Sequence, residues 1–482
     1  MSPYWLNNSC SPYTPYASAD GSGPCTLGNL AQYAIRVEHA ADVVAGVSFA
    51  QRHNVRLTIK NTGHDAQGRS AGAGSLGLWM HNLKDITFPD YSSPRYQGRA
   101  ARMAAGIQVQ EAYEAASDHG LTILGGFGPS VGVAGGWLQG GGHGPLASMY
   151  GLGADNTLEF EVVTADGVIV TAAPDNDHSD LYWALSGGGP GNYGVVLSVT
   201  VKAWPDTPVA GAMFTFANTN EDSYWKAIRG WMKTLLTLNR IPGLSTASGF
   251  SSQGFTMNFA TLPGGTTETL REALASYMTQ LKKLGVFMVA DVTHMQSSFF
   301  DHYKTFADSP PINITMGSRL IPASLVQDDD QLDTLVSTMK TLVIREQGVF
   351  ALISNNVSLS RVGIAADDNA VLPAWRDALF LANFGVYVSD GEPWANLSAD
   401  QTRVNHWQTL LRDQTPGSGA YGNEATFNNA MWKEDYFGAN YDRLLAVKRA
   451  YDPHGLFWAN TVVGSDAHWV MQPDGRLCRP DR

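Results

Sequence analysis

His64 is the residue of this chain whose type and setting point most directly to chemistry. It follows the segment 57–62 through Gly63, and a second glycine-dense segment covers residues 125–143. Glycine lets a backbone approach a ligand closely and present its N–H groups to phosphate. A nucleophilic imidazole flanked by two such segments predicts a bound cofactor that carries a pyrophosphate and that the histidine can tether covalently.

Two other glycine patterns, residues 72–77 and 189–194, match the spacing of a dinucleotide-binding fingerprint. Neither is predicted to open a helix directly after a strand, which the phosphate-binding geometry of that fingerprint requires. We interpret both segments as glycine turns, so nicotinamide binding by a Rossmann unit is disfavoured.

Ser130 lies in Gly128-Pro-Ser-Val-Gly132, which matches the nucleophile elbow of serine hydrolases. An elbow needs a helix after the serine, whereas the glycines beyond Val131 are a poor helix start because each interior glycine costs about 1 kcal/mol. A secreted serine hydrolase using Ser130 is therefore a remote alternative. No metal site is indicated, since the 12 histidines are scattered and the sequence contains neither His-Glu-x-x-His nor Cys-x-x-Cys.

Length and charge limit the classes of protein to consider. The 482 residues exceed what one core comfortably fills, so two domains are expected. The formal net charge of −12 repels phosphate backbones and anionic lipid, which disfavours nucleic acid as a partner. No apolar run approaches the length of about 18 residues that a membrane span needs.

Cysteines and glycosylation sequons favour a secreted protein. Cys10 and Cys25 lie in a leader rich in serine, proline and glycine, where a disulfide would contribute roughly 3 kcal/mol, and Cys478 is left over. Sequons for N-glycans occur at Asn7, Asn313, Asn356 and Asn396. The first residues lack the features of a signal peptide, so we expect that a signal was removed; a cytosolic protein with unused sequons is the alternative.

The element that must present His64 is a βαβ-like unit. Strands over 33–37 and 55–59 are predicted around a helix over 40–52, whose apolar residues recur at helical spacing. The unit delivers His64 at a strand end, where ligands commonly bind. Further elements are expected as a helix over 108–118, a hairpin over 158–171, a helix near 180–185 and a strand over 195–201.

Beyond residue 205, glycine becomes sparse and longer helices alternate with strands. Helices are predicted over 222–238, 268–284 and 330–346, and strands over 256–260, 349–354 and 384–388. This pattern suits an antiparallel sheet with helices on one side. We expect a first domain over 1–205, completed by the tail 436–482 with its helix over 441–453, and a second domain over 206–435.

Motifs in the first domain and the tail resemble the fungal branch of the berberine-bridge-enzyme-like FAD-linked oxidases, in the vanillyl-alcohol-oxidase superfamily. The matching residues are Gly63-His64-Asp65, Gly128-Pro-Ser-Val-Gly132, Gly140-Gly-Gly-His143, Tyr150-Gly151, Asp155-Asn156, 180–189, 192–194, 441–444 and 451–453. The resemblance implies an α+β fold with a PCMH-type FAD-binding domain and a substrate-binding domain whose antiparallel sheet is covered by helices. It also implies an enzyme, an FAD-linked oxidoreductase.

In that family the histidine of the Gly-His motif carries the flavin through its 8α-methyl group, which implies a covalent bond from His64. The pyrophosphate is expected on backbone N–H groups of 60–65 and 125–132. Other residues implied near FAD are Asn61, Thr62, Gly63, Asp65, Gly128, Ser130, Val131, Gly132, Gly135, Gly142, His143, Gly194 and Asn460.

Two positions in the glycine segment bear on the kind of flavoenzyme. Many relatives have a cysteine, and a second covalent bond, where this chain has Gly128, so FAD should be held through one bond only. Val131 stands where valine in relatives is associated with access of O2, which implies an oxidase. An ordinary packed valine is the alternative reading.

Gly419–Ala425 resembles the Tyr-x-Asn-Glu strand that lines the substrate side of the flavin in relatives. Strand alternation would place Tyr421 and Asn423 on one face and Glu424 on the other, unless a bulge intervenes. We assign Tyr421 as the base, supported by Asn423, and keep Glu424 as the alternative. A phenol, with a pKa near ~10, needs nearby positive charge or donors to act as a base at neutral pH.

The resulting prediction is an FAD-dependent oxidase of an alcohol, sugar or secondary metabolite. The base takes a proton from a hydroxyl or amine, hydride moves from the adjacent carbon to flavin N5, and O2 reoxidises the flavin and releases H2O2. A flavin-dependent oxidative cyclase of a natural-product pathway is the main alternative. A redox-silent carbohydrate-binding protein is a remote one.

Overall fold

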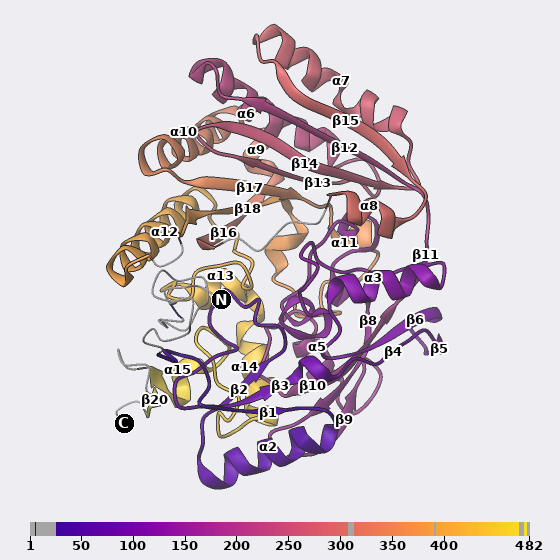
Figure 1. Ribbon diagram of the computed structural model, residues 1–482, viewed down its shortest axis with the longest axis vertical. Helices are drawn as coiled ribbons and strands as arrows, with labels where there is room; N and C mark the ends of the chain where they lie inside the picture. The colour runs from indigo at the N-terminus through magenta and orange to yellow at the C-terminus, as the bar shows by residue number, and fades with distance from the viewer. Residues whose placement is uncertain (1–4, 6–25, 307–312, 390–391, 472–476, 480–482) are drawn as a thin grey trace, which may run out of the picture.

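The computed structural model describes residues 5, 26–306, 313–389, 392–471 and 477–479, and it shows an α+β protein with two sheet systems. The sheets formed by residues 33–202 lie in the lower half of Figure 1, and a larger sheet from residues 209–387 lies in the upper half. The C-terminal helix α14 (Tyr441–Tyr451) returns to the lower half and contacts α5 (Ser179–Leu185). The domain boundaries given above stay a prediction.

A small parallel sheet leads the chain to His64. Its strands lie in the order β1 (Tyr33–Arg36), β3 (Leu76–Trp79) and β2 (Leu57–Lys60), with α2 (Ala40–His53) packed on them. The helix buries Val43, Val47 and Ala50, whose helical spacing brings them into one apolar cluster with Leu78 of β3. The predicted elements of this unit are confirmed, and β3 is inserted between the two predicted strands.

An antiparallel sheet forms the second part of the lower half. Its strands lie in the order β4 (Ile86–Thr87), β6 (Gln97–Ala104), β10 (Val195–Lys202), β8 (Thr157–Val163) and β9 (Ile169–Ala172), with β5 (Asp90–Ser92) beside β6. β10 is central and almost all of its residues are buried. The hairpin, the strand and the two helices predicted for this region, α3 (Val109–Asp118) and α5, are confirmed.

The upper half is one seven-stranded antiparallel sheet. Its order is β15 (Met288–Gln296), β12 (Val209–Ala217), β14 (Gly254–Pro263), β13 (Ser245–Phe250), β17 (Val349–Ser354), β18 (Ala378–Tyr387) and β16 (Ile314–Pro322). The long helices are α6 (Glu221–Leu238), α7 (Thr267–Lys283), α10 (Asp329–Glu346) and α12 (Trp394–Gln414). Their apolar faces share one core with the sheet, which leaves the other face of the sheet turned toward the lower half.

Shorter elements connect these layers. They are β7 (Leu121–Thr122), η2 (Val133–Trp137), α4 (Ala147–Tyr150), η3 (Gly153–Asn156), β11 (Trp204–Pro205), α8 (Phe299–Phe306), α9 (Ala323–Gln327), α11 (Leu359–Val362), η4 (Pro373–Arg376), α13 (Trp432–Tyr436), α15 (Ser465–His468), β19 (Val470–Met471) and β20 (Leu477–Cys478).

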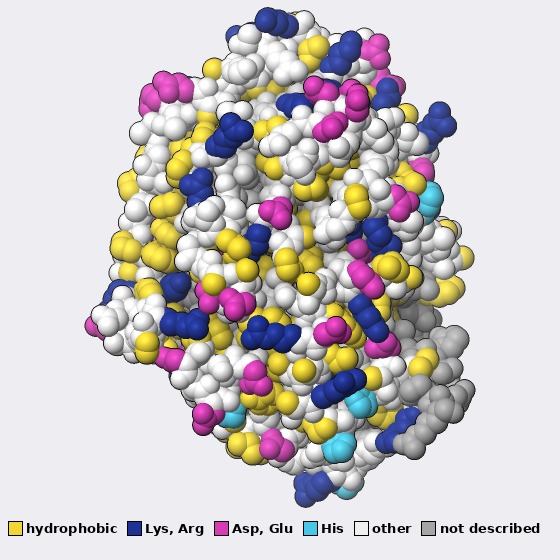
Figure 2. Space-filling model, turned by 180° about the vertical axis from the view of Figure 1, so that it is seen from behind, with side chains coloured by type: hydrophobic (Ala, Val, Ile, Leu, Met, Phe, Trp, Pro, Cys, Tyr) yellow, Lys and Arg dark blue, Asp and Glu magenta, His cyan; other side chains and the backbone are white. Residues whose placement is uncertain are grey.

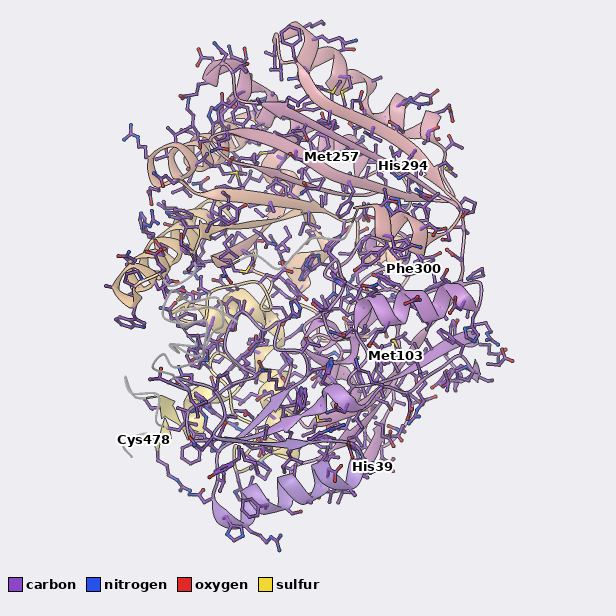
Figure 3. All side chains as sticks on the ribbon, viewed as in Figure 1. His39, Met103, Met257, His294, Phe300 and Cys478 are labelled. Atoms are coloured by element: carbon purple, nitrogen blue, oxygen red, sulfur yellow. The ribbon has the colours of Figure 1, made fainter. Side chains whose placement is uncertain are left out.

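Each half has a large apolar cluster of its own, and a smaller cluster, which includes Leu152 and Leu320, spans the two halves. Met103 on β6 and Met257 on β14, both labelled in Figure 3, are fully buried and belong to different apolar clusters. On the face shown in Figure 2, acidic and basic side chains are interspersed. Within the described ranges, no helix combines the length and the apolar character that a bilayer crossing requires.

Candidate active site

A large cavity lies where the parallel sheet, the glycine-rich segment and residues 421–424 meet. Its empty volume is about 1460 Å³, which includes space open to solvent. Residues from five stretches of the chain line it: parts of 57–65, 126–137, 190–196, 421–424 and 457–458. The cavity therefore gathers both predicted glycine segments, the tail and the Tyr-x-Asn-Glu motif.

His64 enters this cavity through a turn at the end of β2. Gly63 has φ +85°, a left-handed conformation that residues with a side chain rarely adopt, so the turn depends on glycine. The His64 Nε2 atom lies 2.7 Å from Ser130 Oγ. His64 is exposed to the cavity, but desolvation by the surrounding protein lowers its pKa, so the imidazole is neutral, and hence nucleophilic, at neutral pH.

The glycine-rich loop opposite His64 is held by the start of α3. The Val109 N–H donates to the Val131 carbonyl over 2.9 Å, and Gln108 Nε2 donates to the Ser130 carbonyl over 2.9 Å. A Cβ atom at Gly132 would lie 2.3 Å from Asn61 Nδ2, so only glycine lets this loop approach the β2 turn so closely. Ser130 is followed by the irregular turn η2 and not by the helix that a nucleophile elbow needs.

Buried polar atoms without a hydrogen-bond partner among the described residues lie on the cavity wall. They are Asn61 Oδ1, Ser70 Oγ, Gln139 Oε1 and His143 Nδ1. Buried polar groups are rarely left unpaired, so these atoms indicate a bound polar molecule. A flavin dinucleotide, whose ring and ribityl chain offer both donors and acceptors, fits this wall and the glycine loop.

The Tyr-x-Asn-Glu motif is a turn and not the strand predicted from the sequence. The Glu424 N–H donates to the Tyr421 carbonyl over 2.9 Å, which closes the turn. Tyr421, Asn423 and Glu424 consequently all line the same cavity, whereas strand alternation had placed Glu424 on the opposite face.

Tyr421 is held in a protonated state. Asn423 Nδ2 donates to its hydroxyl over 2.8 Å, but burial and the negative charge of Glu424 raise the pKa of Tyr421 well above its usual value. The donors that the sequence argument required are present but do not lower the net pKa. The environment thus argues against Tyr421 as a base.

Glu424 has the opposite electrostatic setting. Its two carboxylate oxygens accept hydrogen bonds from His143 Nε2 over 3.0 Å and from Asn383 Nδ2 over 2.7 Å. Burial alone would raise the pKa of Glu424, but the charge and hydrogen bond of His143, with that of Asn383, outweigh it and lower the pKa. The carboxylate therefore stays ionised beside the cavity and can accept a proton.

Sequence reasoning did not single out Arg69. Its Nε donates to Asp65 Oδ1 over 3.0 Å, and its Nη2 donates to Asn423 Oδ1 over 2.8 Å. The guanidinium thus joins the turn that carries His64 to the turn that carries Glu424. Arg69 is the only Lys or Arg in the glycine-rich stretch 63–77, which was the available signal, but nothing local in the sequence indicates its distant partner.

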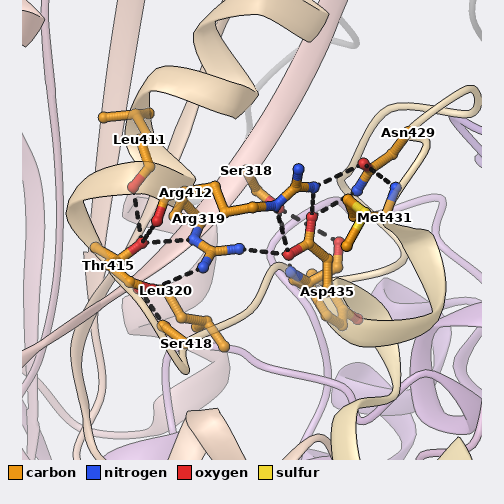
Figure 4. A network of polar contacts seen from close by, with 11 residues as sticks. Ser318, Arg319, Leu320, Leu411, Arg412, Thr415, Ser418, Asn429, Met431 and Asp435 are labelled. Carbon is orange, nitrogen blue, oxygen red and sulfur yellow. Dashed lines mark hydrogen bonds and ion pairs between the residues drawn. The ribbon is translucent and has the colours of Figure 1, made fainter.

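A buried polar network fixes the base of the Tyr421 turn (Figure 4). Asp435 accepts hydrogen bonds from Arg319 Nη1 over 2.7 Å and from Arg412. The Asp435 carbonyl also accepts from the Ala420 N–H over 2.8 Å, directly before Tyr421. The network therefore joins β16, α12 and α13 to the segment that carries Glu424.

Most of the residues predicted to bind the cofactor line the cavity, and three of them do not. Thr62, Gly63, Asp65, Gly128, Val131, Gly132, Gly135 and Gly194 line the cavity with His64, Asn61 and His143. Ser130, Gly142 and Asn460 do not line it; Gly142 instead packs against Trp137, and Asn460 donates to the Phe427 carbonyl. Ser130 still reaches the site through its contact with His64.

Other predictions can be compared only partly with the structure. Asn7, Cys10 and Cys25 lie outside the described residues, and Cys478 is a free, exposed thiol. Within the ranges that the structure covers, no cluster of three or more His, Cys, Asp or Glu side chains could hold a metal ion.

Known protein families match two parts of the chain. A family model described as an FAD binding domain matches residues 31–173, and one described as "Berberine and berberine like" matches residues 420–464. The first range contains His64 and the glycine-rich loop, and the second contains the Tyr421 turn.

Similar proteins match the chain almost end to end. FAD-linked oxidoreductase patO of Aspergillus clavatus is 38% identical, over 98% of this chain and 81% of that protein. VAO-type flavoprotein oxidase VAO615 of Thermothelomyces thermophilus is 38% identical, over 99% and 83%. Bifunctional decalin synthase calF of Penicillium decumbens is 37% identical, also over 99% and 83%.

Solved structures agree with these matches. The VAO-type flavoprotein MtVAO615 from Myceliophthora thermophila superposes with a TM-score of 0.91 at 37% identity, over 99% of this chain and 86% of that chain. A chitooligosaccharide oxidase superposes with a TM-score of 0.73 at 21% identity, over 90% of this chain and 92% of that chain, which shows a shared fold alone.

Proposed function

Because the chain belongs to the berberine-bridge-enzyme-like, VAO-type family of FAD-linked oxidoreductases, we propose that it is an oxidase that carries FAD on His64 and oxidises a small organic substrate. The observation that carries this proposal is the placement of one neutral imidazole beside a glycine-rich loop in a cavity with unpaired polar atoms. The secreted serine hydrolase is set aside, because Ser130 is followed by an irregular turn and the family is an oxidoreductase family.

Asn61, Ser70 and Gln139 would bind the polar edges of the cofactor, and the loop around Gly132 would lie along its pyrophosphate. When bound, FAD supplies the two-electron acceptor for a substrate hydride and passes the electrons to O2, which becomes H2O2. Val131 lines the cavity, and its modest side chain supports access of O2. The likeness to a protein named as an oxidase supports the same reading.

Glu424 is the proton acceptor in this proposal. Its depressed pKa keeps it ionised, and the hydrogen bonds from His143 and Asn383 hold the carboxylate at the cavity wall. A substrate hydroxyl or amine placed there loses its proton to Glu424 Oε1 or Oε2 as hydride leaves the adjacent carbon. Tyr421 and Asn423, which stay neutral, orient the substrate through hydrogen bonds.

The test combines mass and turnover. Intact-mass measurement of the purified protein should show one FAD adduct, and His64→Ala should lose it while the fold is kept. A panel of primary alcohols, oligosaccharides and phenols should identify a substrate that yields H2O2. An unmodified wild-type mass, or an adduct retained in His64→Ala, would rule out the assigned tether.

An oxidative cyclase is the second candidate. The similarity to a protein named as a bifunctional decalin synthase favours it, because a decalin is a fused ring system. The two candidates differ in product: a ring-closed isomer or oxidised cyclic product from a linear precursor supports the cyclase, and a simple aldehyde or ketone supports the oxidase.

We also propose that the protein is secreted with N-glycans on Asn313 and Asn396, which are both exposed. The third described sequon is less suited, because Asn356 is half-buried and its Nδ2 donates to the Asn239 carbonyl over 2.9 Å, whereas the Nδ2 of Asn396 donates to Glu392 at an exposed position. Glycopeptide mass spectrometry of protein secreted from a fungal host should find glycans at Asn313 and Asn396 and an unmodified Asn356.

A further inference from the structure

Ser130 and His64 form a hydrogen-bonded pair that the proposed catalytic cycle does not use. Their Oγ and Nε2 atoms are 2.7 Å apart, although the two residues are 66 positions apart in the chain. A serine–histidine pair could indicate a hydrolase, but such a pair needs an acid that orients the histidine. The adjacent carboxylate, Asp65, is instead engaged by Arg69 and by the Ser70 N–H.

The fold imposes this contact from both sides. Ser130 lies in a loop whose carbonyl groups on either side, Pro129 and Val131, accept from the backbone of α3, while its own carbonyl accepts from Gln108. His64 is presented by the left-handed Gly63 turn. Because the backbone fixes the positions of both residues, the Ser130 hydroxyl sets the orientation of the His64 ring.

The hydrogen bond also determines which ring nitrogen is reactive. In a neutral imidazole one nitrogen carries the proton, and the partner of that nitrogen fixes the tautomer. If Ser130 Oγ accepts the Nε2–H, Nδ1 keeps its lone pair and can form a new bond. If the contact is lost, the ring can rotate and the other tautomer becomes accessible.

We propose that Ser130 is a positioning residue for covalent attachment of the flavin, because its hydroxyl accepts the Nε2–H of His64 and leaves Nδ1 as the nucleophile. The proposal rests on the proposed function, in which His64 carries FAD. It gives Ser130 a role in the formation of the holoenzyme that is separate from substrate oxidation.

Covalent attachment of the flavin is a two-electron oxidation that O2 completes. One bond forms between Nδ1 and the 8α-methyl carbon of the flavin, one C–H bond breaks at that carbon, and the imidazole loses the proton on Nε2. The C–H electron pair passes to the flavin ring, and O2 then removes it with two protons as H2O2. Ser130 Oγ stabilises the positive charge that develops on the ring when Nδ1 is alkylated.

The experiment measures attachment and not turnover. Wild-type protein and variants, made under flavin-limited conditions, are incubated with FAD. Covalent flavin is followed by the fluorescence that stays with the acid-precipitated polypeptide and by intact mass. Ser130→Ala should slow attachment by about fivefold, the factor that corresponds to the net contribution of one typical hydrogen bond, while FAD still binds noncovalently.

Matched variants separate the hydroxyl from its surroundings. Ser130→Thr, which keeps the hydroxyl, should attach FAD at nearly the wild-type rate. Ser130→Val, which has the shape of threonine but no hydroxyl, should attach FAD slowly. Ser276→Ala, at an exposed position on α7, should behave as wild type.

The outcomes distinguish this proposal from the proposed function. Wild-type attachment rates in Ser130→Ala or Ser130→Val would overturn the role of Ser130, as would an equal slowing in Ser276→Ala. An absent adduct in the wild type, or an adduct that persists in His64→Ala, would instead overturn the tether to His64 on which the proposal rests.

Discussion

Glu424 and Tyr421 are three residues apart, and their surroundings push their pKa values in opposite directions. The carboxyl pKa is lowered by its His143 and Asn383 partners, while the phenol pKa is raised by burial and by Glu424 itself. Two titratable groups separated in this way take different roles, one as proton acceptor and the other as a neutral hydrogen-bonding group.

Replacing each group should therefore have a different effect. Glu424→Gln should slow anaerobic flavin reduction by about 10²-fold or more, the usual scale for loss of a general base, and Tyr421→Phe should slow it much less. Because the folded-state pKa of Glu424 is depressed, the wild-type rate should hold as pH falls through the usual glutamate value of about 4.3 and decline only below it. Stopped-flow spectroscopy across pH measures both effects, and a larger loss in Tyr421→Phe would reverse the assignment.

Substitution of Gly128 tests the prediction that FAD is held through one covalent bond only. A Cβ atom there would meet only Val131 Cγ2, at 3.1 Å, and the residue has no left-handed backbone angle. A cysteine should therefore fit with a small adjustment of Val131. In a His64→Ala background, Gly128→Cys should restore a covalent flavin adduct, which intact-mass measurement would detect. Gly128→Ser is the control and should not restore it. A missing adduct in the cysteine variant would show that the space at position 128 is not sufficient for a covalent bond to the flavin.

At the scale of elements, the Arg319, Arg412 and Asp435 network ties β16, α12 and α13 to the turn that carries Glu424. Burial would raise the pKa of Asp435, but the Arg412 hydrogen bond and the Arg319 charge outweigh it and lower that pKa. A carboxyl whose folded pKa lies below its unfolded value of about 3.9 contributes stability that is fully present above that value. The contribution is lost as pH falls through the folded pKa.

Asp435→Asn should remove this part of the acid dependence. At neutral pH the variant should lose about 3–5 kcal/mol of unfolding free energy, because Arg319 stays buried with its charge uncompensated. Denaturant titrations at several pH values measure both quantities. An unchanged acid slope in the variant would show that the network does not govern acid stability.

At the scale of the whole molecule, the buried ion pair between Arg376 and Asp155 joins the two halves. Arg376 of η4 makes two hydrogen bonds to Asp155 of η3, at 2.9 and 2.8 Å, and the Asp155 side chain is 0% exposed. Because the cavity is built by residues from both halves, this pair helps to hold its walls together.

Asp155→Ala should therefore destabilise the protein by about 3–5 kcal/mol, since it leaves the Arg376 charge buried without a partner. The matched control is Asp90→Ala, which breaks an exposed pair with Arg99 and should cost less than about 1 kcal/mol. Thermal and denaturant unfolding compare the two variants. Similar losses in both would show that the contact between the halves is not the source.

The sequence by itself determined the cofactor class and most helices and strands, and it predicted His64 as the covalent tether. Helices such as α2, α6 and α10 could be predicted because apolar residues at helical spacing record burial within one local segment. The Gly63–His64 turn and the 128–132 loop could be identified because glycine is needed wherever the backbone is left-handed or closely approached. Helical spacing and glycine positions are both local features, so they can be recognised directly in the amino-acid sequence.

Only the tertiary structure decided which groups meet at the cavity and in what protonation state. The motif at 421–424 becomes a turn because β16 and the Asp435 network hold its start, and this brings Glu424 to the same side as Tyr421. Arg69 forms a hydrogen bond with Asn423, which is 354 positions away in the chain, and His143 forms one with Glu424, which is 281 positions away. Contacts over such separations depend on how layers pack, and the pKa of each group depends on those contacts, so no local pattern of residues could specify them.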